Sequence, residues 1–299
     1  MSLLIVGTVA FDGIETPFGK VDKILGGSAT YIGIAASYFT KSSNLISVVG
    51  GDFLKKDIEL LKKHNINCDG LKIINTEKTF FWSGKYHDNM NIRDTIETQL
   101  NVLEKFNPNI PENYQDCQYL MLANLMPSLQ LKTLNQLKNS PLLTITDTMN
   151  YWMDNCLEDL HQVILKTDVL IINDEEALQL SKKNNLTDAA KKILTMGPSY
   201  LIIKKGTEGA LLFNENNMFD CPAFPVKECI DPTGAGDTFA GAFVGYLNNA
   251  NNTSFESMKN GIIKACAMAS FCVEDFGVNN IIHQSIEEIN ARSFSISKR

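Results

Sequence analysis

Short apolar runs, rich in branched side chains, recur along this chain and constrain its fold more than any other feature. Runs of this length are typical of strands buried on both faces. They lie at Leu3–Val6, Leu45–Val49, Tyr119–Leu122, Leu142–Ile145, Val169–Ile172 and Leu201–Ile203. Longer stretches with helical spacing follow at residues 52–64, 128–138, 155–166 and 186–195, and residues 236–274 are almost wholly helical in pattern. The alternation predicts an α/β fold in which helices cover a mainly parallel central sheet.

Two segments interrupt the alternation. Residues 11–25 form an excursion that contains Gly and Pro directly after the first predicted strand, and residues 73–103 carry the run TFFWSGKYHDN. That run alternates like an exposed strand rather than a core strand. We predict that both segments are additions to one edge of the sheet. Because no repeat, low-complexity linker or charge block divides the chain, residues 1–299 are predicted to form a single domain.

The composition narrows the class of partner. The chain has 27 Lys and Arg against 34 Asp and Glu, a formal charge of −7, which argues against a nucleic-acid partner. No window approaches the roughly 18 apolar residues that span a bilayer, and the first residues lack a basic leader and a cleavage site. The seven cysteines form no C-x-x-C pair and are expected to be reduced. We therefore expect a soluble, cytoplasmic protein with neither a nucleic-acid nor a membrane partner.

The run DPTGAGDTFAGAF, Asp231–Phe243, is the sharpest motif in the chain. Gly234 and Gly236 permit backbone angles that turn successive N–H groups to one side, and the apolar residues after them have the spacing of a buried helix face. A helix start with free N–H groups binds anions, most often a phosphoryl group. Asp237 would repel that anion unless it accepts a proton from an attacking hydroxyl. The spacing alone leaves two interpretations open, a catalytic base and a first-turn Asp that stabilises the helix dipole.

The motif DPTGAGDTF closely resembles the C-terminal signature of the ribokinase-like carbohydrate kinases, the PfkB family, with both glycines and both aspartates in place. The resemblance implies a three-layer α/β/α ribokinase-like fold and a single kinase domain, with a small β lid formed by residues of about 11–25 and 73–103. It also implies that Asp237 is the general base.

Further roles in the same loop follow from the resemblance. The amides of Gly234, Ala235 and Gly236 would form the anion hole for the transferring phosphoryl group. Asp231 and Thr233 would belong to the loop scaffold near a monovalent cation such as K⁺.

The resemblance extends over nearly the whole chain. Gly26 and Gly27 match the glycine pair that contacts the acceptor in this family, and Asp12 falls where family members bind sugar hydroxyls. Asn173 and Glu176 fit the N-x-x-E motif, which helps to hold the phosphates and a hydrated Mg²⁺, so Glu176 is expected to hold Mg²⁺ through water.

The nucleotide end of the site is implied in the same way. Lys205, Gly206 and Gly209 fit the strand and turn that approach the nucleotide, and Gly277 is expected near the adenine. Residues 50–52, Gly-Gly-Asp, resemble a turn that the family has after an earlier strand.

Each match also has an ordinary structural interpretation. Gly26 and Gly27 could form a loop before a helix that starts near Ser28, and Asp12 could be a turn aspartate. Glu176 could be a solvated acid, although its place just after a strand is where open α/β sheets bind ligands. The shared order of the matches along the chain is what favours function.

Tyr31 departs from the family pattern. Family members that phosphorylate simple sugars usually have Asn a few residues after the glycine pair, where this chain reads GGSATYIG. A phenol reaches further than a carboxamide and offers one hydroxyl, so an acceptor in contact with Tyr31 would be held differently. The identity of the acceptor is therefore open, while phosphoryl transfer is still expected.

The predicted lid strand contains Phe80, Phe81, Trp82 and Tyr86. Alternation places Phe80 and Trp82 on one face and Phe81 on the other, so these rings either cover the acceptor or pack the lid onto the body. The free edges of such strands would be satisfied by a homodimer through the lid.

Two cations of this segment, Lys85 and Arg93, could clamp a phosphate if the acceptor is already phosphorylated. An exposed loop arginine is also common without any such role, so both interpretations stay open.

The sequence thus predicts an ATP-dependent kinase with Mg²⁺ that phosphorylates a hydroxyl of a sugar or sugar-like small molecule. Two alternatives are a nucleoside (adenosine-type) kinase of the same family and a catalytically drifted protein that only binds a metabolite or nucleotide. A dinucleotide-dependent dehydrogenase is disfavoured because the first strand leads into GTVAFDG rather than G-x-G-x-x-G. A metal hydrolase lacks support because the four histidines are far apart in the sequence.

Overall fold

The computed structural model describes residues 2–299 and is organised around a nine-stranded sheet with the order β13-β12-β11-β10-β9-β8-β1-β4-β5. All neighbours from β11 to β5 are parallel, and β12 and β13 join one edge as antiparallel strands. The strands are β1 (Leu3–Val6), β4 (Ser43–Gly50), β5 (Ile66–Ile74), β8 (Tyr119–Leu122), β9 (Leu143–Asp147), β10 (Val169–Asn173), β11 (Tyr200–Lys204), β12 (Ala210–Phe213) and β13 (Met218–Cys221). The predicted mainly parallel sheet is confirmed.

Both faces of this sheet are buried, which explains the continuous apolar runs. In β1, Leu3 and Ile5 join the hydrophobic cluster on one face, while Leu4 and Val6 join a cluster on the other. All four side chains are fully buried. Such a strand cannot tolerate a polar residue at either alternate position, so its sequence reads as unbroken hydrophobics.

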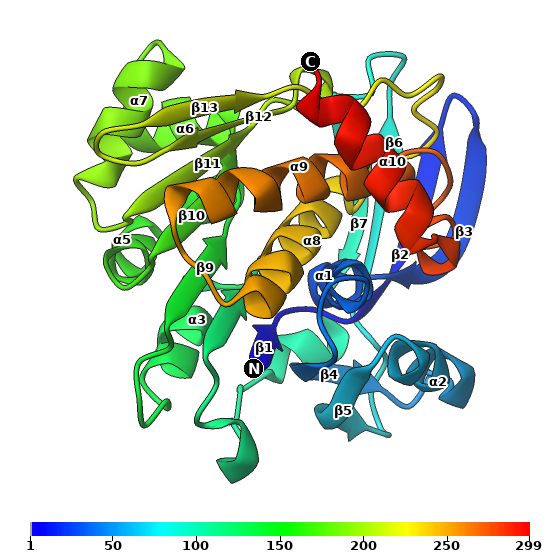
Figure 1. Cartoon of the computed structure of the whole chain (residues 1–299). Coiled ribbons are helices and arrows are strands. Elements are labelled where there is room, and N and C mark those ends of the chain that lie inside the picture. The colour runs from blue at the N-terminus through cyan, green and yellow to red at the C-terminus, as the bar shows by residue number, and fades with distance from the viewer. Residues whose placement is uncertain (1) are drawn as a thin grey trace.

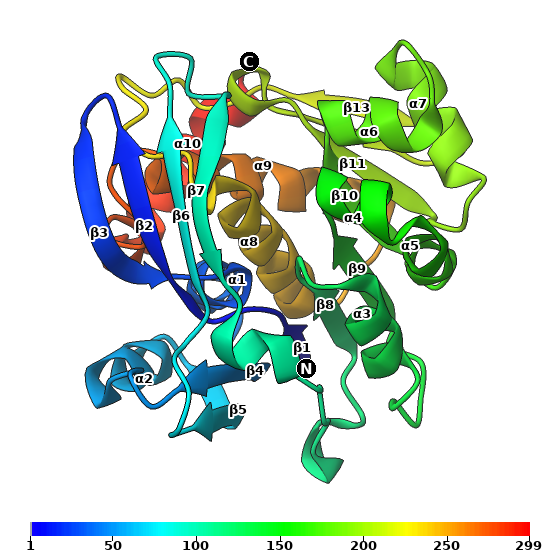
Figure 2. The same ribbon diagram turned by 180° about the vertical axis from the view of Figure 1, so that it is seen from behind.

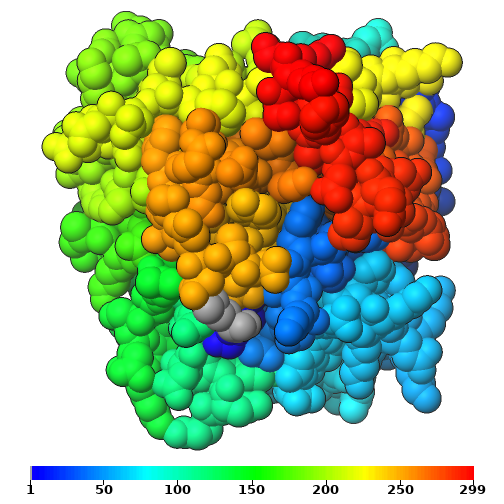
Figure 3. All heavy atoms as spheres, viewed as in Figure 1, coloured from blue at the N-terminus to red at the C-terminus, as the bar shows by residue number. Residues whose placement is uncertain are grey.

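Helices form a layer on each face, as the two opposite views show (Figures 1 and 2). One layer contains α1 (Ser28–Ser37), α2 (Lys55–Lys63), α8 (Ala235–Ala250), α9 (Phe255–Cys272) and α10 (Ile286–Ser297). The other contains α3 (Pro127–Leu134), α4 (Asn150–Asn155), α5 (Leu157–Leu165), α6 (Asp174–Ser181) and α7 (Leu186–Leu194). Figure 3 shows how α9 and α10, in orange and red, cover the first face. The three-layer α/β/α architecture is therefore confirmed.

Element boundaries differ from the predicted ones where the backbone turns locally. The helix predicted over 155–166 begins at Leu157, because Cys156 has φ −141° and separates α4 from α5. The helix predicted over 52–64 begins at Lys55 after an extended Leu54. Within residues 2–299, no helix combines the length and apolar character needed to cross a membrane.

A separate four-stranded sheet, with the order β3-β2-β6-β7, stands beside the body. Its strands are β2 (Ala10–Thr16), β3 (Gly19–Gly26), β6 (Phe81–Tyr86) and β7 (Arg93–Gln99). We call it the small sheet; Figure 2 shows it in blue and cyan, next to α8. The segments 11–25 and 73–103 both contribute strands to it. The second segment starts later than residue 73, because Ile73 and Ile74 still pair with β4 of the large sheet.

Candidate active site

Three adjacent parallel strands of the large sheet each have a polar residue at the carboxyl end. Asp147 is the last residue of β9, Asn173 of β10 and Lys204 of β11, and Asn173 lies directly opposite Lys204 in the strand register. The carboxyl ends of parallel strands are where open α/β sheets bind ligands. The helix α8 begins at this same place, since a Cβ built on Gly236 would lie only 2.9 Å from Nζ of Lys204. The strand ends and the start of α8 therefore form one site.

The start of α8 leaves backbone donors free. Gly234 has φ 75°, is the N-cap residue and provides no side-chain cap. The N–H of Ala235 donates to the carbonyl of Pro232 at 3.2 Å, whereas within residues 2–299 the N–H groups of Gly236 and Asp237 have no acceptor. The N–H of Gly234 has no acceptor among the described residues either, so two of the three predicted amides, those of Gly234 and Gly236, are free, while the turn at Pro232 uses that of Ala235. Their contact with a phosphoryl group stays a prediction.

Asp237 lies in the first turn of α8 and is half-buried. Burial raises the pKa of its carboxyl to about 7, with a further contribution from the charge of Asp147, while Lys204 opposes the shift. The charge of Asp12 also raises this pKa, so Asp237 shares its surroundings with a residue from the start of the chain. The half-buried carboxyl of Asp237 thus lies near the charges of Asp147, Lys204 and Asp12, which favours the catalytic interpretation over helix stabilisation.

Asp12 and the glycine pair form a second buried element. The carboxyl of Asp12 on β2 occupies the space that a side chain at position 26 would need, since a Cβ on Gly26 would lie 1.9 Å from its Oδ2. Gly27 has φ 90°, and a Cβ there would lie 2.6 Å from the carbonyl oxygen of Thr8. Burial raises the pKa of Asp12 to about 7, and a hydrogen bond from the N–H of Gly27 opposes it. Both glycines are thus required by close packing.

Tyr31 lies between the start of α8 and the buried Asp12. Its ring lies against the glycine turn, because a Cβ on Gly234 would be 2.3 Å from its Cε1. The side chain is 1% exposed, and its hydroxyl has no hydrogen-bond partner among the described residues. Burial, together with the charges of Asp12 and other acids nearby, raises the pKa of Tyr31 well above its usual value. Tyr31 therefore supports the site from inside instead of presenting an open phenol, and its predicted contact with the acceptor stays a prediction.

Asp231 holds the loop before α8 to the loop after α9. Its Oδ1 accepts the N–H of Thr233 at 2.8 Å, and its Oδ2 accepts the N–H of Gly277 at 2.9 Å. Gly277 packs against Ile24 of the small sheet, and the Thr233 hydroxyl lies 3.0 Å from that of Tyr86. These residues connect the small sheet to the loop. The predicted monovalent cation near Asp231 and Thr233 and the predicted adenine contact of Gly277 stay predictions.

Asn173 and Glu176 form a reciprocal cap at the start of α6. The Oδ1 of Asn173 accepts the N–H of Glu176 at 2.7 Å, and Oε2 of Glu176 accepts the N–H of Asn173 at 2.8 Å. This capping box fixes the Glu176 carboxyl near the carboxyl end of β10. Burial raises the pKa of Glu176 to about 7, while Lys204 lowers it and Asp147 raises it. Within residues 2–299 no group of three or more His, Cys, Asp or Glu side chains is placed to hold a metal directly.

Two consecutive lysines at the end of β11, Lys204 and Lys205, have different partners. Successive side chains of a strand point to opposite faces. Lys205 pairs with Asp220 at 3.0 Å, and its side chain is 13% exposed, whereas Nζ of Lys204 lies 3.3 Å from Oδ1 of Asp147, near the start of α8. The contact of Lys205 with a nucleotide stays a prediction. Lys204 and Asp147 were missed. The signal that could have found them is their shared position one or two residues after a predicted apolar strand, since those strands were predicted to end at Ile145 and Ile203.

The turn after β11 faces the tip of the small sheet. Gly206 has φ 54°, and the nearest atom to a Cβ there would be Oδ1 of Asn91, at 3.7 Å. Gly209 has φ 95° and packs against the backbone of Cys221. These glycines therefore shape the turn, and their contact with a nucleotide stays a prediction.

Of the two cations that could clamp a phosphate, Lys85 and Arg93, only Arg93 acts on the acidic residues of the site. Its guanidinium lies 5.3 Å from the ring centre of Trp82, and its charge lowers the pKa values of Tyr86, Asp12 and Asp237 against the dominant effect of burial. Lys85 instead pairs with Glu15 at 2.7 Å on the small sheet.

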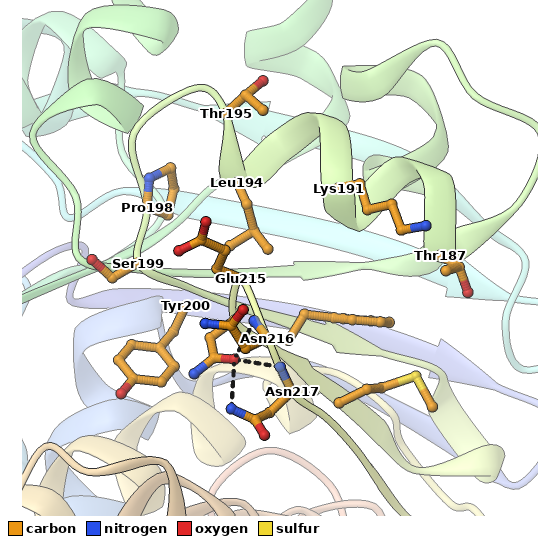
Figure 4. A pocket seen from close by; sticks show the side chains of 13 residues that line it. Thr187, Lys191, Leu194, Thr195, Pro198, Ser199, Tyr200, Glu215, Asn216 and Asn217 are labelled. Atoms are coloured by element: carbon orange, nitrogen blue, oxygen red, sulfur yellow. Dashed lines mark hydrogen bonds between the residues drawn. The ribbon is translucent and has the colours of Figure 1, made fainter.

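A pocket of about 700 Å³ lies elsewhere, between α7 and the turn that joins β12 to β13 (Figure 4). Its turn is held by hydrogen bonds from the N–H groups of Asn216 and Asn217 to Oδ1 of Asn214. None of the predicted site residues lines this pocket.

Comparison with known proteins agrees with this geometry. The pfkB family carbohydrate kinase domain matches residues 8–285. A cytidine kinase of Thermococcus kodakarensis is 28% identical over 82% of this chain and 87% of its own length. A nucleoside kinase of Methanocaldococcus jannaschii is 27% identical over 88% of this chain and 83% of its own length.

Solved structures share the fold. The M. jannaschii nucleoside kinase, described as an archaeal member of the ribokinase family, superposes with a TM-score of 0.78 at 22% identity, over 98% of both chains. An E. coli protein described as ribokinase II, in complex with ATP and Mg²⁺, superposes with a TM-score of 0.81 at 20% identity, over 98% of this chain and 99% of its own. With the family domain matched over most of its length, the chain belongs to the pfkB family of carbohydrate kinases.

Proposed function

We propose that this pfkB family kinase transfers the γ-phosphoryl group of ATP to a hydroxyl of a nucleoside or sugar, with a nucleoside as the preferred acceptor. The observation that supports this proposal most strongly is the position of the half-buried Asp237, which lies beside free amides at the start of α8 and near Asp12. The relatives that span more than four fifths of this chain and are named cytidine or nucleoside kinase support the nucleoside. A ribokinase of Dictyostelium discoideum, 25% identical over 89% of this chain, keeps a simple sugar as the second candidate.

Asp237 acts as the base in this proposal. The acceptor hydroxyl attacks the γ-phosphorus and loses its proton to Asp237, which must be ionised beforehand. Asp12 accepts a hydrogen bond from another acceptor hydroxyl, and its fixed position against Gly26 and Gly27 orients the acceptor. The N–H groups of Gly236 and Asp237 stabilise the charge on the transferring group. Catalysis is then mainly positioning and electrostatic stabilisation.

The charge of the site supports a divalent cation alongside ATP. The carboxyl groups of Asp147, Glu176 and Asp237 lie around Lys204, and Asp12 lies near Asp237, so an entering triphosphate meets more acidic than basic groups. Mg²⁺ usually binds through one or two carboxylates, water and substrate phosphates. A site in which, among the described residues, no three acidic, His or Cys side chains are placed to hold a metal is consistent with this mode of binding. The fixed carboxyl of Glu176 would hold it through water. When bound, Mg²⁺ supplies charge neutralisation on the phosphates.

The small sheet is proposed as a lid over the acceptor, with Arg93 facing the phosphates. Closure would exclude water that could otherwise accept the phosphoryl group. Its outer strand β7 is largely exposed and could pair with that of a second chain in a homodimer. The seven cysteines, all free among the described residues, support action in the reducing cytoplasm. The net charge of −7 supports a small-molecule acceptor rather than nucleic acid.

A panel of nucleosides, sugars and sugar phosphates, assayed with ATP and Mg²⁺ for ADP and phosphorylated product, tests the proposal. We expect product with at least one nucleoside, and a loss of about 10³-fold or more in kcat for Asp237→Asn, with ATP binding retained. Asp188→Asn is the matched control, because Asp188 occupies the same first-turn position in α7, away from the site.

Three outcomes separate the alternatives. If only sugars gave product, the acceptor would be a sugar and not a nucleoside. Nucleotide binding without product from any acceptor would indicate a drifted binding protein. Turnover of Asp237→Asn close to that of the unchanged protein would remove Asp237 as the base.

A further inference from the structure

Lys204 is a partly buried cation to which the mechanism above assigns no role. It ends β11, and its Nζ lies 3.3 Å from Oδ1 of Asp147 and next to Gly236 in the first turn of α8. The side chain is only 20% exposed. A lysine in such a place loses most of its hydration, so the structure must compensate with partners.

The partners present do not use all of its donors. An ammonium group has three N–H donors. Within residues 2–299 its one hydrogen-bond acceptor is Oδ1 of Asp147, and that contact is long for a charged pair. The ammonium of the neighbouring Lys205, whose side chain is 13% exposed, is paired more closely, at 3.0 Å, with Asp220. Lys204 therefore has donor capacity left, at the point where the free amides of Gly236 and Asp237 also lie.

The surrounding charges keep the ammonium protonated. Burial alone would lower the pKa of Lys204, but the charges of Asp147, Glu176 and Asp237 outweigh it and raise the pKa above its usual value. The lysine thus carries a full positive charge at the strand ends, among carboxyl groups and backbone amides.

We propose that Lys204 donates a hydrogen bond to the γ-phosphoryl group of bound ATP and holds it against the start of α8 during transfer. This inference rests on the function proposed above. During the reaction the acceptor oxygen forms a bond to the γ-phosphorus, the bond to the β–γ bridging oxygen breaks, and ADP leaves with that oxygen. The acceptor proton goes to Asp237, while Lys204 keeps its own protons. Lys204 would then stabilise charge without exchanging a proton.

Three variants test the proposal: Lys204→Met, Lys204→Arg and the double variant Lys204→Met with Asp147→Asn. The single Met variant leaves Asp147 buried without its partner and can lose stability for that reason alone. The double variant removes the whole ion pair and separates this structural effect from catalysis. Lys259→Met is the control, since Lys259 is a partly buried lysine on α9 that pairs with Glu256 away from the site. Thermal unfolding is measured for each protein, with kcat, KM and the Kd values of ATP and ADP in the presence of Mg²⁺.

We expect the double variant to fold and to lose about 10²–10³-fold in kcat, the usual effect of removing one donor to a developing anion. Its affinity for ATP should fall by about tenfold or more, while that for ADP, which lacks the γ-phosphoryl group, changes little. Lys204→Arg should retain more activity than Lys204→Met because it keeps the charge.

A folded double variant with kcat close to that of the unchanged protein would overturn the proposal, since Lys204 would then only neutralise Asp147. An equal loss of ATP and ADP affinity would also overturn it. Failure of the proposed function appears differently, as an unchanged protein that phosphorylates nothing in the acceptor panel. The comparison of ATP with ADP needs no acceptor, so it tests Lys204 even in that case.

Discussion

Replacing Asp12 by Asn should change how the stability of this protein depends on pH. The carboxyl of Asp12 is 5% exposed, and burial raises its pKa from the ordinary 3.8 to about 7. Between these two values the folded chain binds a proton that the unfolded chain releases. The stability that this proton contributes is therefore present at low pH and is lost as the pH rises through about 7.

The size of the effect follows from the same numbers. At about 1.36 kcal/mol for each unit of pH, a carboxyl whose pKa moves from 3.8 to about 7 weakens folding by roughly 4 kcal/mol at pH 8 relative to pH 3 to 4. An Asn side chain has nearly the same shape and does not ionise. Relative to the unchanged protein, Asp12→Asn should thus become more stable by an amount that grows with pH and approaches this value.

Urea unfolding at a series of pH values from 4 to 8, followed by circular dichroism, measures this difference. Any constant effect of the amide cancels when the difference is compared across pH. Asp22→Asn is the control, because the Asp22 carboxylate on β3 is 85% exposed and stays in water on folding. A stability difference for Asp12→Asn that does not vary with pH would refute the view that this carboxyl is desolvated against the glycine pair.

Three further predictions concern activity and the glycine turn. Because burial raises the pKa of the Asp237 base to about 7, kcat/KM should rise with pH through about 7, and be about 100-fold lower at pH 5; a flat profile over that range would contradict the assignment. Gly234→Ala should destabilise the protein by more than about 1–2 kcal/mol in urea unfolding and reduce turnover, because its φ is 75° and the added Cβ would lie 2.3 Å from the Tyr31 ring; unchanged stability would contradict the packing described. Arg93→Ala should lower kcat/KM by at least about tenfold in a steady-state assay, whereas Lys85→Ala, which removes a surface pair with Glu15, should have little effect. Unchanged kcat/KM for Arg93→Ala would contradict its proposed role, and equal losses in both variants would contradict the difference between the two residues.

Some residues of the site can be recognised from a short stretch of sequence, and others cannot. The motif around Asp237 could be recognised because a glycine turn, an acid and a helix face lie within a few consecutive residues. Lys204 and Asp147 could not be found in that way, since each is separated in the sequence from the residues it meets. The packing of the Tyr31 ring against Gly234 is a further contact between residues far apart in the sequence, which no local pattern indicates.

The sequence alone determined the layered α/β fold, because strands buried on both faces must be continuously apolar and helices between them must have one apolar face. It also determined the helix start that offers amides to an anion, since that depends on local backbone freedom. Only the tertiary structure decided which polar residues meet there, because Asp12, Asp147, Lys204 and Asp237 are brought together by strand register and by the packing of α8 on the sheet. Their raised pKa values follow from burial, which no single stretch of sequence specifies.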